Sequence, residues 1–159
     1  MITSGLKRCI SQQYKVFCTL MVALGVLLLP VGFALPTGWT VVEGDVTFDQ
    51  SGSVLNITSI SQNAVIEYIS FDLASGETIN FVMPNAGASI LNRVLGGNVS
   101  NIAGVINANG KLGIVNTAGL NIANSAQIQA AALLATTLNI SNEDFASDMM
   151  KLAKDASNS

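Results

Sequence analysis

Short stretches of alternating hydrophobic and polar residues dominate the chain from Thr40 to Asn139. Turn-forming Asn, Gly and Ser residues separate these stretches. A period of two puts every second side chain on one face of a β-strand, and a helical period fits no stretch better, although Gln127 to Leu134 is ambiguous. Five segments present an apolar face in this way: Leu55–Ile57, Ile79–Phe81, Leu112–Ile114, Leu120–Ile122 and Leu138–Ile140. The pattern predicts an all-β domain built from many short strands.

The tripeptide Leu-Asn-Ile occurs three times, and the copies that begin at Leu120 and Leu138 are 18 residues apart. One coil of a β-solenoid needs about 20 residues. In such a coil the apolar side chains point into a narrow core, and asparagines at the corners tolerate the left-handed conformation and stack from coil to coil. The spacing favours a β-solenoid, with an ordinary β-sandwich of similar length as the alternative.

The end of the chain has a different pattern. Ser141-Asn142-Glu143-Asp144 has the form of a helix capping box with an acidic first turn. Phe145, Met149 and Leu152 follow at helical spacing. We therefore predict a short amphipathic helix from Glu143 to about Ala156. It either covers the open end of the solenoid, where strand edges are exposed, or forms a frayed terminus.

The start of the chain is organised as a secretory signal peptide. Three basic residues lie within the first fifteen positions, and an apolar run extends from Val16 to Phe33. Gly32 and Ala34 are small residues suited to the −3 and −1 positions of a cleavage site, so we expect cleavage between Ala34 and Leu35. Residues 1–34 would then be a leader for the Sec export machinery. The run is borderline for spanning about 30 Å of hydrocarbon, and a retained membrane anchor is the alternative.

Composition and charge restrict the chemistry of the remaining chain. There is no histidine, and both cysteines, Cys9 and Cys18, precede the cleavage site. Removal of the leader leaves four basic and ten acidic residues, a net charge of −6, which is a poor basis for binding nucleic acid. Five carboxylates are spread along the chain without forming a cluster: Asp45, Asp49, Glu67, Asp72 and Glu77. We therefore expect no enzyme, no metal site, no cofactor and no nucleic-acid partner.

Several sequence blocks follow the leader, in the order and at nearly the spacing of a known family. They are Leu35-Pro36-Thr37-Gly38, Ser51–Ile57, Phe71–Pro84, Leu91-Asn92-Arg93-Val94, Ile106–Lys111, Asn116–Leu120 and Ala135–Phe145. Together they resemble the N-terminal secretion domain of two-partner-secreted exoproteins of the filamentous-haemagglutinin type. The resemblance covers residues 35–145 and leaves residues 146–159 as a short helical or disordered tail.

This resemblance implies a right-handed parallel β-helix with an N-terminal cap of extra strands and a short C-terminal helix. It also implies a secretion-targeting role in a Gram-negative bacterium. An outer-membrane transporter of the partner class would bind the exported chain through its periplasmic domains, and the chain would then fold outside the cell or on its surface. A host surface or a glycan is a second class of partner that adhesins of this kind suggest.

The resemblance also singles out residues for transporter recognition or for a structural motif. They are Asn92, Arg93, Val94, Asn107, Asn109, Gly110, Asn116 and Gly119. Arg93 is the only arginine after the leader. It suits either a surface that the transporter recognises or an anchor between coils that uses charge-assisted hydrogen bonds. For Asn107 and Asn116 the structural interpretation, corner and ladder bonds, is favoured.

The chain departs from the family pattern in three places. Trp39 stands where a small residue is usual, and the turn Asn116-Thr117-Ala118-Gly119 lacks the family's proline. The sequence also stops soon after Phe145, where family domains continue through further coils. Two further hypotheses follow: a free-standing adhesive or carbohydrate-binding β-helix that uses Trp39 as a sugar platform, or a truncated remnant.

Overall fold

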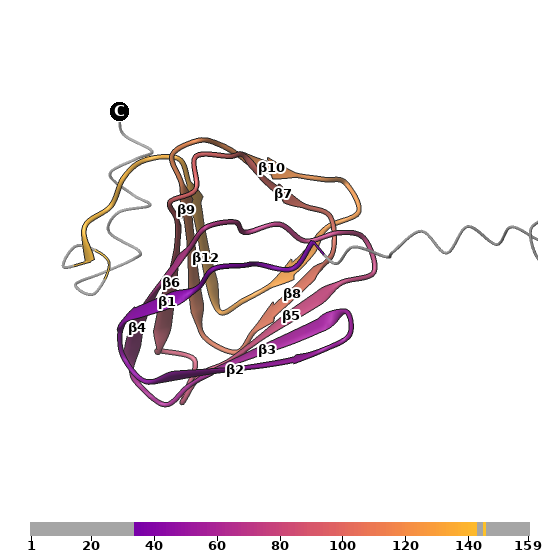
Figure 1. Cartoon of the computed structure of the whole chain (residues 1–159). Coiled ribbons are helices and arrows are strands. Elements are labelled where there is room, and N and C mark those ends of the chain that lie inside the picture. The colour runs from indigo at the N-terminus through magenta and orange to yellow at the C-terminus, as the bar shows by residue number, and fades with distance from the viewer. Residues whose placement is uncertain (1–33, 143–144, 146–159) are drawn as a thin grey trace, which may run out of the picture. The chain divides into compact units, whose positions relative to one another are not determined.

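A computed structural model describes residues 34–142 and 145 of the 159-residue chain. Apart from Ala34, the expected leader lies outside the described residues, and so does most of the expected C-terminal helix. The described residues form twelve strands arranged in three sheets (Figure 1). Helical backbone occurs in this part of the chain only at Asn142 and Phe145.

Parallel pairing between successive coils builds the three sheets (Figure 1). The coil strands of the first sheet are β3 (Val54–Ser59), β5 (Thr78–Val82), β8 (Val105–Ala108) and β11 (Gln127–Gln129). Those of the second sheet are β4 (Asn63–Tyr68), β6 (Ser89–Val94), β9 (Lys111–Asn116) and β12 (Ala132–Thr136). The third sheet contains β7 (Ser100–Ile102) and β10 (Leu120–Ile122), and a parallel bridge joins Leu73 to Ile102. The chain visits the three sheets in turn, which is the path of a parallel β-helix.

Two antiparallel strands close the N-terminal end of the β-helix. The strand β1 (Thr40–Glu43) pairs with β4, and β2 (Val46–Ser51) pairs with β3. The turn between β2 and β3 contains Gly52, whose φ of 56° is readily adopted only by glycine. The two strands cover edges that would otherwise expose unpaired backbone groups. The expected all-β class, parallel β-helix and N-terminal β cap are therefore confirmed.

The alternating pattern of the sequence builds the core. Leu55, Ile79 and Ile106 are register partners on three successive strands, and all three are fully buried. Burial of each such side chain contributes about 1.5–3 kcal/mol. Of the five predicted apolar faces, those beginning at Leu55, Ile79 and Leu112 point inward as expected. The other two expectations were wrong at Ile122 and Leu138, which are 45% and 61% exposed.

The Leu-Asn-Ile tripeptide does not mark the structural repeat. Leu55–Ile57 lies in β3 of the first sheet, Leu120–Ile122 forms β10 of the third, and Leu138–Ile140 lies outside the strands. The true repeat varies in length. Thr78 pairs with Val105, 27 residues further on, whereas Ser100 pairs with Leu120, 20 residues further on. Because the corners absorb these differences, a fixed sequence period could not have revealed the coils.

Asparagine side chains connect the coils in a ladder along the first sheet. Asn80 Nδ2 donates to Asn56 Oδ1 at 2.9 Å, and Asn107 Nδ2 donates to Asn80 Oδ1 at 2.9 Å. The expected stacking therefore exists, but these asparagines lie within strands and not at corners. Among the described residues positive φ angles occur only at glycines, so the expected left-handed asparagines are absent there.

We expect Asn80→Ala to lower the free energy of unfolding by about 1–3 kcal/mol, because it removes the side chain that bonds two neighbouring amides at once. Urea unfolding followed by Trp39 fluorescence measures the effect. Asn121→Ala is the control, since Asn121 is exposed and makes a single side-chain bond, to Asn101. Its effect should stay within about 0.5 kcal/mol. Equal losses in the two variants would contradict a stabilising role for the ladder.

Candidate functional site

Asn92 lies in the middle of β6 and faces the interior of the β-helix. Its register partners are Ile66 and Ile114, both core residues, and its side chain is fully buried. The Tyr68 hydroxyl donates to Asn92 Oδ1 at 3.0 Å, and Asn92 Nδ2 donates to the Gly113 carbonyl at 3.0 Å. Burial raises the pKa of the Tyr68 phenol well above its usual value, so the hydroxyl keeps its proton as a donor. From inside the β-helix, Asn92 therefore links its own coil to the coil before it and to the coil after it.

Arg93 points to the opposite face of the same sheet. Its Nη2 donates to the Ile140 carbonyl at 2.6 Å, and its Nη1 lies 3.5 Å from Glu67 Oε1 on the preceding coil. The Arg93 side chain is 14% exposed, and its Nε has no partner among the described residues. Arg93 thus holds the segment that follows β12 against the outer face of the second sheet.

A second apolar cluster lies under that segment. Val65, Leu91 and Val115 form it on the outer face of the second sheet, and Ile140 and Phe145 cover it. This arrangement makes both faces of the sheet buried at its centre. It explains why five of the six residues of β6 are buried, without the alternation of a strand that has one face in water.

Gly113 makes room for the Phe145 ring. A Cβ atom at position 113 would lie 2.8 Å from Phe145 Cε2 and 3.0 Å from Leu91 Cδ1. Phe145 N donates to the Ser141 carbonyl at 3.1 Å, which is one helical turn. The described residues of this segment pack on the outer face of the second sheet, and the expectation that the helix covers the open end stays a prediction. The rest of the predicted helix, from Glu143 to Ala156, lies outside the described residues.

The remaining predicted residues do not join Asn92 and Arg93 in one patch. Val94 is buried in the core, and Asn107 belongs to the ladder of the first sheet. Asn109 clamps the next corner: its Oδ1 accepts from Met83 N at 2.7 Å, and its Nδ2 donates to Met83 O at 2.8 Å. A Cβ atom on Gly110 would lie 2.7 Å from the Ala88 carbonyl. Each of these residues fixes one coil to its neighbour.

Asn116 fixes the corner between the second and third sheets. It is buried, and its Nδ2 donates to the Asn98 carbonyl at 2.8 Å and to Ser100 Oγ at 2.9 Å. Its Oδ1 accepts from Ala118 N at 2.9 Å. Gly119, with a φ of 132°, closes the same turn. The turn keeps its shape without the family's proline because the asparagine side chain bonds both of its arms.

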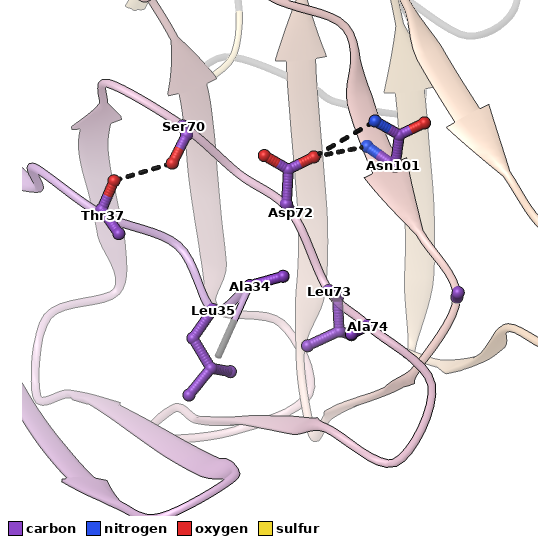
Figure 2. Close-up of a pocket in the computed structure, with 9 residues that line it drawn as sticks. Ala34, Leu35, Thr37, Ser70, Asp72, Leu73, Ala74 and Asn101 are labelled. Carbon is purple, nitrogen blue, oxygen red and sulfur yellow. Dashed lines mark hydrogen bonds between the residues drawn. The ribbon is translucent and has the colours of Figure 1, made fainter. Parts of the chain in front are cut away.

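The expected cleavage site lies beside the carboxylate of Glu77. Leu35 is 3% exposed and packs in the core, and Ala34 N donates to Glu77 Oε1 at 2.7 Å. Figure 2 shows Ala34 and Leu35 across from Leu73 and Ala74, along a depression of about 390 Å³. Glu77 itself is 4% exposed. In the sequence it was one of several scattered acids, and no local pattern distinguished it.

Trp39, the residue of the carbohydrate hypothesis, lies on the cap. Its ring stacks on Phe48 with a centroid distance of 4.8 Å and an interplanar angle of 13°. The side chain is 37% exposed. Phe48 therefore covers one face of the Trp39 ring.

Two further features of the described residues bear on other kinds of function. In this part of the chain no three His, Cys, Asp or Glu residues are placed to hold a metal ion together. No helix of the described residues has the length and apolar character to cross a membrane.

Known proteins share this architecture. The family model of the TPS secretion domain, where TPS stands for two-partner secretion, matches residues 33–158. Two heme/hemopexin-binding proteins of Haemophilus influenzae are similar: one is 36% identical over 106 residues, the other 39% over 100 residues. These matches cover 67% and 62% of this chain but only 12% and 11% of the relatives' lengths. The crystal structure of the HMW1 secretion domain from Haemophilus influenzae matches with a TM-score of 0.67 and 28% identity, over 70% of this chain and 30% of that one.

A capped parallel β-helix that matches this family model over most of its length is a secretion domain by architecture. The chain belongs to the TPS secretion domain family. Its function is that of the secretion domain of two-partner-secreted exoproteins, a class that Gram-negative bacteria export. The family consists of secretion domains and is not a family of enzymes.

We expect Phe145→Ala to lower the free energy of unfolding by about 3 kcal/mol, because it removes the largest side chain of the outer cluster. The segment from Leu138 onward should also become sensitive to limited proteolysis. Leu138→Ala is the control, since Leu138 is 61% exposed and should matter little. Proteolysis at the same rate in Phe145→Ala and the unaltered chain would show that Phe145 does not hold the segment.

Proposed function

We propose that this domain is the export address of a secreted adhesin-like protein and that an outer-membrane transporter of the two-partner class recognises it. The observation that carries the proposal is the capped parallel β-helix in a chain of the TPS secretion domain family. The basic and apolar segments before Ala34 support the route to the periplasm, through the Sec machinery and cleavage between Ala34 and Leu35. Residues 35–145 then form the working domain and residues 146–159 its tail.

The transporter binds the chain before the β-helix has folded. Asn92, Val94 and Asn116 are at most 5% exposed in the folded domain, so a receptor can reach their side chains only in an open chain. In that state the strands also have unpaired backbone groups, which can add to a receptive sheet edge by β-augmentation. Recognition and structure then use the same residues at different times. Inside the folded domain, these side chains bond the coils to each other.

Folding outside the cell proceeds from the capped end. The strands β1 and β2 protect the edges of β4 and β3, so new coils can add only on the other side of the first coil. Each added coil pairs with the coil before it and extends the same core. A capped first coil therefore acts as the nucleus for the remaining coils.

The first test is an export assay with and without a cognate transporter. We expect a form that begins at Leu35 to reach the medium only when the transporter is present. N-terminal sequencing of the released protein measures both the release and the cleavage site. Retention in the periplasm under both conditions would contradict the proposed function.

A second test separates recognition from stability with matched variants. Asn92→Ala and Tyr68→Phe both remove the bond between these side chains, but only the first removes the amide. Arg93→Ala and Phe145→Ala both release the segment on the second sheet, but only the first removes the guanidinium. We expect Asn92→Ala and Arg93→Ala to lower transporter-dependent release several-fold more than their partners at equal stability. Equal release within each pair would contradict recognition of Asn92 and Arg93.

A further inference from the structure

Glu77 is a buried carboxylate without a cation. Its Oε1 accepts from Ala34 N and its Oε2 accepts from Ala74 N, both at 2.7 Å. The only ion pair among the described residues joins Arg93 to Glu67, so no side chain in this part of the chain neutralises Glu77. A carboxylate that is 4% exposed is costly to bury unless a positive charge or several hydrogen bonds compensate it.

The chain is fixed in place directly after Ala34. Leu35 and Pro36 are both buried, and Leu35 belongs to the core cluster. The Leu35 N–H bonds none of the described residues. One residue of chain spans at most about 3.6 Å, so the Leu35 nitrogen lies within about 6 Å of Glu77 Oε1, given the 2.7 Å bond to Ala34 N. The nitrogen that cleavage turns into an ammonium therefore lies close to the Glu77 carboxylate.

We propose that the Leu35 ammonium created by leader removal is the counter-charge of Glu77. This inference rests on the cleavage included in the proposed function. Water hydrolyses the Ala34–Leu35 peptide bond: the hydroxyl goes to the Ala34 carbonyl carbon, and the Leu35 nitrogen becomes an amine that takes up a proton. Ala34 leaves with its N–H, so Glu77 Oε1 loses a neutral donor. The new ammonium replaces it with a charge-assisted hydrogen bond.

This ion pair makes leader removal a step in folding. Leu35 and Pro36 are buried in the folded domain. The peptidase must therefore cut before the β-helix closes around this N-terminal segment. Glu77 precedes β5 directly, and its backbone N–H bonds the Ala74 carbonyl at 3.1 Å. The ammonium thus joins the N-terminus of the mature chain to the start of β5, in the second coil. A chain that keeps its leader lacks this charge and folds into a less stable β-helix.

The test is a double-variant cycle on residues 35–159, released from a fusion with a free amine at Leu35. One change acetylates that amine, and the other is Glu77→Gln. Urea unfolding should show that each change alone lowers the ratio of folded to unfolded chain at least tenfold. The two together should cost little more than one, because both remove the same pair. Glu43→Gln, on the exposed end of β1, is the control for loss of an acidic charge. Additive effects, or no effect of acetylation, would overturn the proposal.

Titration of the Leu35 amine by NMR in the unaltered processed chain decides the matter even if Glu77→Gln fails to fold. We expect the pKa of the amine to lie above its ordinary value of about 7.7–8.0. The stability from the pair is then complete below that value and is lost as the pH rises through the raised pKa. Asp72 is the carboxylate that lines the depression beside Ala34 and Leu35, and its Oδ1 already accepts from Asn101 N at 2.8 Å. Asp72→Asn should therefore leave most of the shift in place.

An amine pKa at or below the ordinary value would refute the pair. The purified chain has a defined end, so this result does not depend on where the bacterium cuts. Sequencing of the exported protein therefore reports separately on the proposed cleavage.

Discussion

Every strand of a parallel β-helix must find its hydrogen-bonding partner in the next coil, and this requirement leaves two bare edges. At the N-terminal end, β1 and β2 reverse direction and pair antiparallel with the first coil, so the sheet edges pass to two strands that carry little core. At the other end nothing in the described residues pairs with the outer edges of β11 and β12. The described residues therefore end in antiparallel strands on one side and in parallel coil strands on the other, and the proposed order of folding rests on that asymmetry.

Buried polar side chains give the stack of coils a unique register. Apolar side chains alone would tolerate a shift of one coil against the next, because most inward positions carry similar aliphatic groups. Asn92 and Asn116 each bond a backbone carbonyl of another strand or corner, and a shift would leave these buried amides unpaired. The energetic penalty for unpaired buried groups exceeds the gain from a bond, so these residues act mainly against wrong registers.

The sequence predicted the architecture better than it predicted the site. Alternation located the inward faces at Leu55, Ile79 and Leu112, because period two is a local property of a strand. The length of a coil could not be predicted. Thr78 to Val105 and Ser100 to Leu120 differ in span, and only the strand pairing reveals this difference. The outer cluster around Phe145 also escaped, because contact across about fifty residues leaves no local period. The role of Glu77 could not be predicted for the same reason, because its partner Ala34 is 43 residues away.

The amide ladder of the first sheet has a direction. From Asn107 to Asn80 to Asn56, each side chain donates its N–H to the coil before it and offers its oxygen to the coil after it. Their dipoles therefore align along the axis of the β-helix, and each bond polarises the next. A donor that reaches the Asn107 oxygen therefore meets an acceptor already polarised by the two bonds beneath it. The bonds of the ladder are therefore cooperative: each is stronger when the others are present, and the loss of one weakens the rest.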